Sequence, residues 1–116
     1  MYIYEKKYYL PKKKINTKWF ENNNFRWSRI HSDSESDVYI YRFIAWRYGT
    51  AGVLEGEIKV DCLDGSVELG CFDYGTRYCY ASWYNREFGH NKSVEEIDNK
   101  FIKELERLGI KEKAND

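Results

Sequence analysis

The side chains with the clearest capacity for chemistry are carboxylates and aromatic rings that alternate with apolar residues between positions 42 and 83. Alternation with a period of two places such side chains together on one face of a sheet. Ion pairs from carboxylates and burial of rings are typical of a surface that docks on another protein. We predict that this surface meets a basic protein surface, such as a nucleic-acid channel in which carboxylates replace phosphates. The predicted partner-binding residues are Trp46, Glu55, Glu57, Asp61, Glu68, Phe72 and Trp83.

A second group of candidates lies in residues 1–30, where eight basic side chains interleave with aromatic rings against only two glutamates. The sign reverses in residues 31–75, where Asp and Glu outnumber Lys and Arg nine to three, and the net charge of the chain is zero. Cations that follow phosphates, with rings that stack on bases, are the physical basis of single-stranded nucleic-acid binding. No recognition helix or RNP-like motif accompanies them. The candidates for this alternative are Lys12, Lys13, Lys14, Lys18, Trp19, Arg26, Trp27 and Arg29.

Residues suited to catalysis or metal binding are few. The two histidines, His31 and His90, lie far apart in sequence, and the three cysteines lack metal-ligand spacing and are predicted to be buried free thiols. Residues 32–37 (SDSESD) space acids as calcium loops do but lack the glycine and the distal glutamate of such loops. We therefore predict no metal, no cofactor and no enzymatic activity. A Cys79–His90 pair, or acid–base chemistry by His31 with Arg29, are the catalytic alternatives.

The sheet that must position the carboxylates is predicted from the dipeptide Asp64-Gly65, which stands between two alternating runs. This dipeptide is typical of a two-residue hairpin turn. The resulting register places Asp61 directly opposite Glu68, and like charges in that position cost roughly 0.2–1 kcal/mol. Either Lys59 and Arg42 offset the repulsion, or the pair belongs to a functional site.

The other strands follow from the same alternation of apolar and polar residues. A loop at residues 49–52 is predicted to pair Phe43 with Ile58, which leaves Ala45 opposite Gly56 as a low spot on the core face. The predicted strands span residues 2–10, 25–31, 38–48, 53–61, 66–72 and 77–84. The predicted core face carries Tyr39, Tyr41, Phe43, Leu54, Ile58, Val60, Cys62, Val67, Leu69, Cys71, Tyr78 and Tyr80.

Residues 93–109 are the best predicted helix of the chain. Ser93 and Glu96 form a capping-box pattern at its start, and Gly109 supplies the stop. Its apolar stripe, which should cover the core face of the sheet, consists of Val94, Ile97, Phe101, Leu105 and Leu108. The stretch KKKINTKWFENNN, residues 12–24, is predicted to be a loop, with one helical turn starting at Thr17 as the alternative.

These elements predict an α+β fold in one domain over residues 1–116. The fold is a twisted antiparallel sheet of about five to six strands, the last four forming a meander, packed against one C-terminal helix. No apolar run could span a bilayer, and the N-terminus lacks the features of a signal peptide, so we expect a cytoplasmic protein with no membrane partner.

The function that we predict is stoichiometric binding of a protein partner. Small size, a single domain and an aromatic surface with separated charges are typical of small inhibitors. Such proteins include the anti-defence (anti-CRISPR-like) proteins of phages and mobile elements, and immunity proteins. Direct binding of single-stranded nucleic acid is the alternative function. An uncovered apolar face would also suit a homodimer.

Overall fold

The computed structural model describes residues 2–49, 52–86 and 92–114. It contains a six-stranded antiparallel sheet with a long C-terminal helix, which confirms the predicted α+β class. The elements in chain order are η1 (Ile3–Glu5), β1 (Tyr8–Tyr9), η2 (Lys12–Lys14), α1 (Thr17–Asn22), β2 (Arg26–Trp27), β3 (Val38–Tyr48), β4 (Gly52–Asp61), β5 (Ser66–Asp73), α2 (Ala81–Tyr84), α3 (Lys92–Leu108) and β6 (Lys111–Glu112).

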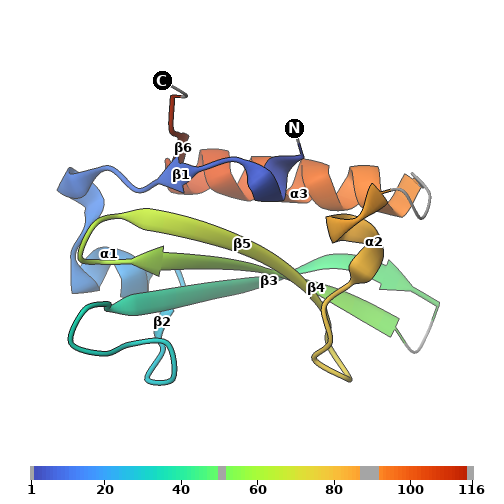
Figure 1. Ribbon diagram of the computed structural model, residues 1–116, viewed down its shortest axis with the longest axis horizontal. Helices are drawn as coiled ribbons and strands as arrows, with labels where there is room; N and C mark the ends of the chain where they lie inside the picture. The colour runs from blue at the N-terminus through green and yellow to red at the C-terminus, as the bar shows by residue number, and fades with distance from the viewer. Residues whose placement is uncertain (1, 50–51, 87–91, 115–116) are drawn as a thin grey trace.

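The strands lie in the order β2-β3-β4-β5-β1-β6, and α3 runs along one side of this sheet (Figure 1). We call the sheet face that packs on α3 the inner face and the opposite one the outer face. All five residues of the predicted apolar stripe of α3 are buried, and the ring of Phe101 meets that of Phe43 with centroids 4.9 Å apart. Gly109 ends the helix with φ of +72°, as predicted. Ser93 lies inside the described helix rather than at its cap.

The hairpin between β4 and β5 has a different turn from the predicted one. Val60 pairs with Val67, and Lys59 pairs with Glu68, so the predicted Asp61–Glu68 pairing is wrong. Gly65 has φ of +78° and donates its N–H to the carbonyl of Asp61 at 2.7 Å. This is a four-residue loop, residues 62–65, closed by a left-handed glycine, which also suits an Asp-Gly sequence. The register moves by two residues, so every side chain keeps its predicted face.

The pairing of β3 with β4 also departs from the prediction, because β3 contains a bulge. Phe43 pairs with Gly56, so the predicted pairing of Ala45 with Gly56 is wrong, although a large ring, that of Phe43, does lie close above this glycine. The register then shifts between Ile44 and Trp46, which leaves Ala45 as the extra residue. The bulge reverses the alternation that follows it, and Trp46 packs against the core instead of facing outward.

Residues 77–84 do not form the predicted fourth strand of the meander. Cys79 bridges to Phe72, but α2 follows at once and brings Trp83 fully into the core. Tyr78, predicted to lie on the core face, is 76% exposed. The N–H of Tyr80 bonds to the carbonyl of Cys71, so this segment covers the edge of β5 that β1 leaves free.

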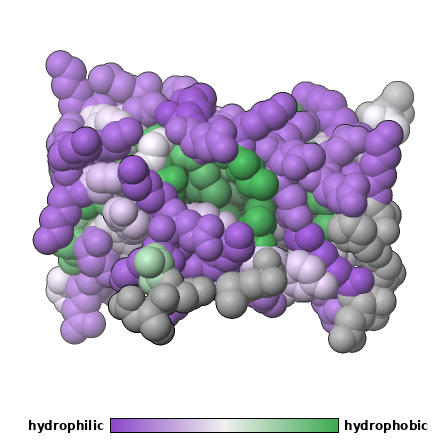
Figure 2. Space-filling model, turned by 90° about the horizontal axis from the view of Figure 1, so that it is seen from above, coloured by the Kyte–Doolittle hydropathy of each residue, from purple (hydrophilic) through white to green (hydrophobic). Residues whose placement is uncertain are grey.

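The N-terminal segment also differs from the single strand predicted for residues 2–10. It forms the short helix η1 and then β1, whose two residues join β5 to β6. The predicted strand at residues 25–31 is reduced to β2, and the short helix α1 starts at Thr17, where the sequence allowed one helical turn within a loop. Seen from above (Figure 2), the side that carries β1 and α3 is largely hydrophilic, with apolar side chains in a central hollow. No helix among the described residues has the length and apolar character needed to cross a membrane.

Candidate partner-binding surface

The outer face of the sheet is the surface on which the sequence places most candidate residues. No described helix packs across it, and Arg42, Ile44 and Glu68 on its strands are exposed. Three hollows open on it, with volumes of about 410, 470 and 450 Å³. We call them the arginine groove beside β2, the central hollow at Lys59 and Glu68, and the apolar hollow between Phe72 and Tyr84. The outer face is therefore uncovered and concave.

Glu57, a predicted partner-binding residue, is held inside the protein. It lies in mid-β4, is only 3% exposed, and receives the Arg42 Nε at 3.1 Å and the Lys59 Nζ at 3.6 Å. A buried carboxylate needs such partners, because desolvation penalises an unpaired charge. Glu57 is therefore a structural anchor for two cations and is not free to meet a partner.

The other predicted carboxylates are also largely engaged within the chain. Arg77 approaches the Glu55 carboxylate at 3.0 Å, and the Asp61 carboxylate accepts the N–H groups of Asp37 and Leu63 in the turn. Glu68 is exposed, and it lies opposite Lys59 in the register. The like-charge pair that the sequence predicts is thus replaced by a ladder of alternating signs, which is favourable across a sheet.

Of the three predicted aromatic anchors, only Phe72 lies on the outer face. It is half-buried, and the guanidinium of Arg77 lies 6.0 Å from its ring centroid. Trp83 is fully buried between Tyr4 and Phe101, and its indole N–H donates to Asp98 at 2.8 Å. With Trp46 also turned inward, the predicted outward placement of both tryptophans is wrong.

The candidates for nucleic-acid binding are divided between two places. Lys12, Lys13 and Lys14 form η2, where the Lys14 Nζ donates to the carbonyl of Leu108, and Trp19 packs against the rings of the core. Lys18 is exposed on α1. The other three candidates, Arg26, Trp27 and Arg29, lie in or just after β2 and line the arginine groove.

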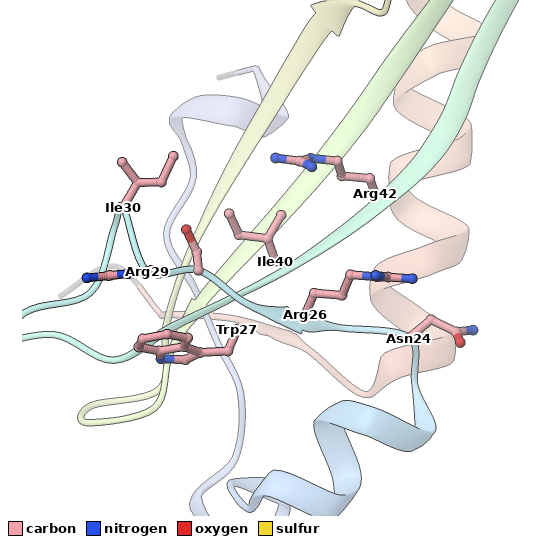
Figure 3. Close-up of a pocket in the computed structure, with 8 residues that line it drawn as sticks. Asn24, Arg26, Trp27, Arg29, Ile30, Ile40 and Arg42 are labelled. Atoms are coloured by element: carbon pink, nitrogen blue, oxygen red, sulfur yellow. The ribbon is translucent and has the colours of Figure 1, made fainter.

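The arginine groove brings three arginines together at one end of the outer face. Arg26 pairs with Ile40 across the strands, which brings it beside Arg42 of β3, and Arg29 follows from the next loop. Figure 3 shows the guanidinium groups of these three arginines spread around Ile40 rather than converging on one point. No carboxylate lines this groove. The sequence does not reveal this groove, because the alternation in residues 25–31 does not specify that they pair with residues 38–48.

The groups with catalytic potential do not form a site among the described residues. His31 is exposed, and His90 lies outside the described residues, as does the predicted Cys79–His90 pairing. Burial raises the pKa of the Cys62 thiol to about 11 and that of Cys71 to about 12, so both are protonated and poor nucleophiles at neutral pH. Cys71 is buried and Cys62 is half-buried, whereas Cys79 is exposed, so the prediction of three buried thiols is wrong for Cys79.

The acidic loop at residues 32–37 uses its carboxylates to fix its own backbone. The Asp33 carboxylate accepts the N–H of Glu35 at 2.7 Å and the hydroxyl of Ser36 at 3.1 Å. These hydrogen bonds lower the pKa of Asp33. Within the described ranges, no group of three or more His, Cys, Asp or Glu side chains is placed to hold a metal ion.

Comparison of the chain with protein-family models, with curated proteins and with solved structures found no match. Its function therefore has to be inferred from its own surface.

Proposed function

We propose that the protein acts as a stoichiometric binding protein that takes a protein partner on the outer face of its sheet. The observation that carries this proposal is the uncovered, concave face with its three hollows. An antiparallel sheet can leave one face to solvent, but such a face is normally polar and alternates cleanly with the core. Here Ile44 is 43% exposed on that face, and Phe72 lines the apolar hollow beside it.

The state of the charges supports a docking role. Glu55 and Glu57 are already paired with arginines and a lysine, so burial against a partner would not leave these carboxylates without counter-charges. Removing unpaired charges from water opposes association, whereas a prepaired ladder is buried at lower cost. The outer face is therefore an interface with its polar groups largely satisfied in advance.

The rim of the face carries residues that often dominate binding energy. Tyr74 is 62% exposed and Tyr78 is 76% exposed in the loop after β5, with Arg77 between them. Tyrosine and arginine are enriched among the residues whose truncation most weakens protein complexes. Such binding inhibits by occupancy and needs no catalytic group, as in small inhibitors of the anti-defence or immunity type.

The test is affinity capture from a lysate of the organism that encodes the protein, with and without nuclease, using two charge-reversed variants. Glu68→Arg changes an exposed side chain in the centre of the outer face, and Glu106→Arg makes the same change on exposed α3. We expect a protein partner that survives nuclease and whose recovery falls at least about tenfold with Glu68→Arg. A reversed charge in the centre of the interface should cost at least about 1.4 kcal/mol, which corresponds to a factor of ten in affinity.

Glu106→Arg should leave the recovery unchanged, which controls for the change in net charge. Equal recovery with both variants would show that the outer face is not the docking surface. Recovery that disappears after nuclease treatment would instead favour the nucleic-acid function.

A further inference from the structure

The edge of β3 beside the arginine groove is open for most of its length. β2 pairs with only two residues of β3, Tyr39 and Ile40. The chain enters β2 from α1 through Asn24, which has φ of +63°, so the residues before β2 lie away from β3, as Figure 3 shows at the end of the groove. No described strand pairs with the rest of this edge.

The direction of the free backbone groups on this edge follows from one hydrogen bond. The N–H of Ser28 donates to the carbonyl of Val38 at 2.8 Å, so Val38 points its backbone groups toward β2. Backbone direction alternates along an antiparallel strand, so Arg42 and Ile44 also direct their N–H and C=O groups to this side. These four groups lie beyond the end of β2 and before the bulge at Ala45.

The side chains along this edge are cationic. β3 contains two arginines and no carboxylate, and Arg26 and Arg29 make no ion pair with any described residue. Arg42 contacts Glu57, but its side chain remains 46% exposed. Because the guanidinium groups are spread around Ile40, they fit several anionic groups along an extended chain better than one small anion.

The surroundings favour an acidic polypeptide over a nucleic acid. Trp27, the ring nearest in sequence, pairs with Tyr39 and so lies on the opposite sheet face from Arg26. Its indole N–H donates to Asp37 at 2.7 Å, which fixes the orientation of its ring. Trp27 also lines the groove, but the free backbone groups of Arg42 and Ile44 can pair with another polypeptide strand, whereas a nucleic acid offers no such backbone.

We propose that an extended acidic segment of the protein partner adds to β3 as a strand beyond the end of β2. Its backbone bonds to Arg42 and Ile44, and its carboxylates meet Arg26, Arg29 and the exposed side of Arg42. This is strand addition, in which backbone hydrogen bonds supply affinity and side chains supply specificity. It rests on the proposed function, because it names the chemistry of the partner at one end of the outer face. It also reverses the charge that the sequence predicts for the partner, since the partner is acidic rather than basic at this site.

The test is a fluorescence-anisotropy titration with a labelled eight-residue peptide of alternating glutamate and valine. We expect saturable binding at low salt that weakens at least tenfold in the double variant Arg26→Glu/Arg29→Glu. The matched control Lys100→Glu/Lys103→Glu changes the same charge on α3 and should bind as the wild type does. A peptide N-methylated at alternate residues should lose binding, because it cannot donate to the free edge while the protein is unchanged.

Each remaining outcome counts against the proposal. It is overturned if the Glu-Val peptide does not bind, if a Lys-Val peptide binds as well, or if N-methylation has no effect. Binding of oligo(dT) that is lost in the arginine variant would assign the groove to nucleic acid instead. Partner capture sensitive to Glu68→Arg but not to the arginine variant would keep the proposed function and reject this inference.

Discussion

The ion pair between Arg86 and Asp98 offers the most direct test of how the core is held together. Arg86 binds the Asp98 carboxylate through two contacts, at 2.6 and 2.8 Å, and its side chain is only 6% exposed. The same carboxylate accepts the indole N–H of Trp83, and the guanidinium stacks on Tyr2 at 4.4 Å. One carboxylate thus joins α2, α3 and the N-terminal segment.

Asp98→Asn should therefore be strongly destabilising. The amide oxygen can still accept from Trp83, but Arg86 is left buried without its counter-charge. Breaking a buried pair from one side costs about 3–5 kcal/mol, and we expect a value near 3 because Asp98 keeps 17% exposure. Urea unfolding followed by tryptophan fluorescence measures the change, provided that the m-value is unaffected.

Two further variants test whether the buried charge of Arg86 causes the loss of stability. Glu104→Gln removes the exposed pair with Arg107 on the same helix and should cost only about 0.2–0.5 kcal/mol. Adding Arg86→Met to Asp98→Asn removes the stranded charge and should restore at least half of the loss. Equal effects of Asp98→Asn and Glu104→Gln, or no recovery in the double variant, would show that the pair does not hold the core.

The glycine turn at Gly65, the Lys59–Glu68 pair and the Cys71 thiol can each be tested by unfolding measurements. Gly65→Ala should lower the free energy of unfolding by about 1–3 kcal/mol more than Gly49→Ala. Both glycines have positive φ, but only at Gly65 would a Cβ contact backbone, 2.7 Å from the Leu10 carbonyl oxygen. Equal losses of stability in urea unfolding would contradict this close approach. A double-mutant cycle between Lys59 and Glu68 should give a coupling of about 0.2–1 kcal/mol, and a coupling of zero would argue against the observed register. Stability should fall above about pH 8, because the unfolded thiols of Cys62 and Cys71 ionise near 8.5 while the folded thiols keep their protons up to about 11 and about 12. Cys71→Ala should reduce this fall in unfolding measured between about pH 8 and about 10.5, and the part due to Cys62 should remain.

The layers of the fold were predictable because they depend on periodicity alone. The stripe of α3 and the alternation in β4 and β5 each specify a buried face, and both faces are as predicted. An error of two residues in the hairpin did not change the faces, since it preserves the parity of the alternation. The stop at Gly109 was predictable because only a left-handed residue ends a helix in this way.

The wrong predictions arose where one residue changes the sheet face that the following side chains occupy, or where a predicted strand becomes a helix. Nothing in the sequence around Ala45 signals a bulge, yet that one residue moves Trp46 from the outer face to the core. Residues 77–84 alternate like a strand, but the burial of Trp83 against Phe101 is worth more than continued pairing, so the chain bends into α2. Both outcomes depend on long-range packing that local pattern does not contain.

The difference between local sequence pattern and long-range packing also explains the charge of the candidate surface. Along the sequence, residues 31–75 are acidic, and a count of charges predicts a basic partner. In the folded sheet, Glu55 and Glu57 form ion pairs with three cations, Arg42, Lys59 and Arg77. Cross-strand pairing and the loop after β5 bring these cations to the two glutamates. Near β2, Arg26 and Arg29 of the basic N-terminal third make no ion pair with the part of the chain that the structure describes. A partner responds to charges that remain unpaired after folding, and at the open edge of β3 these are positive.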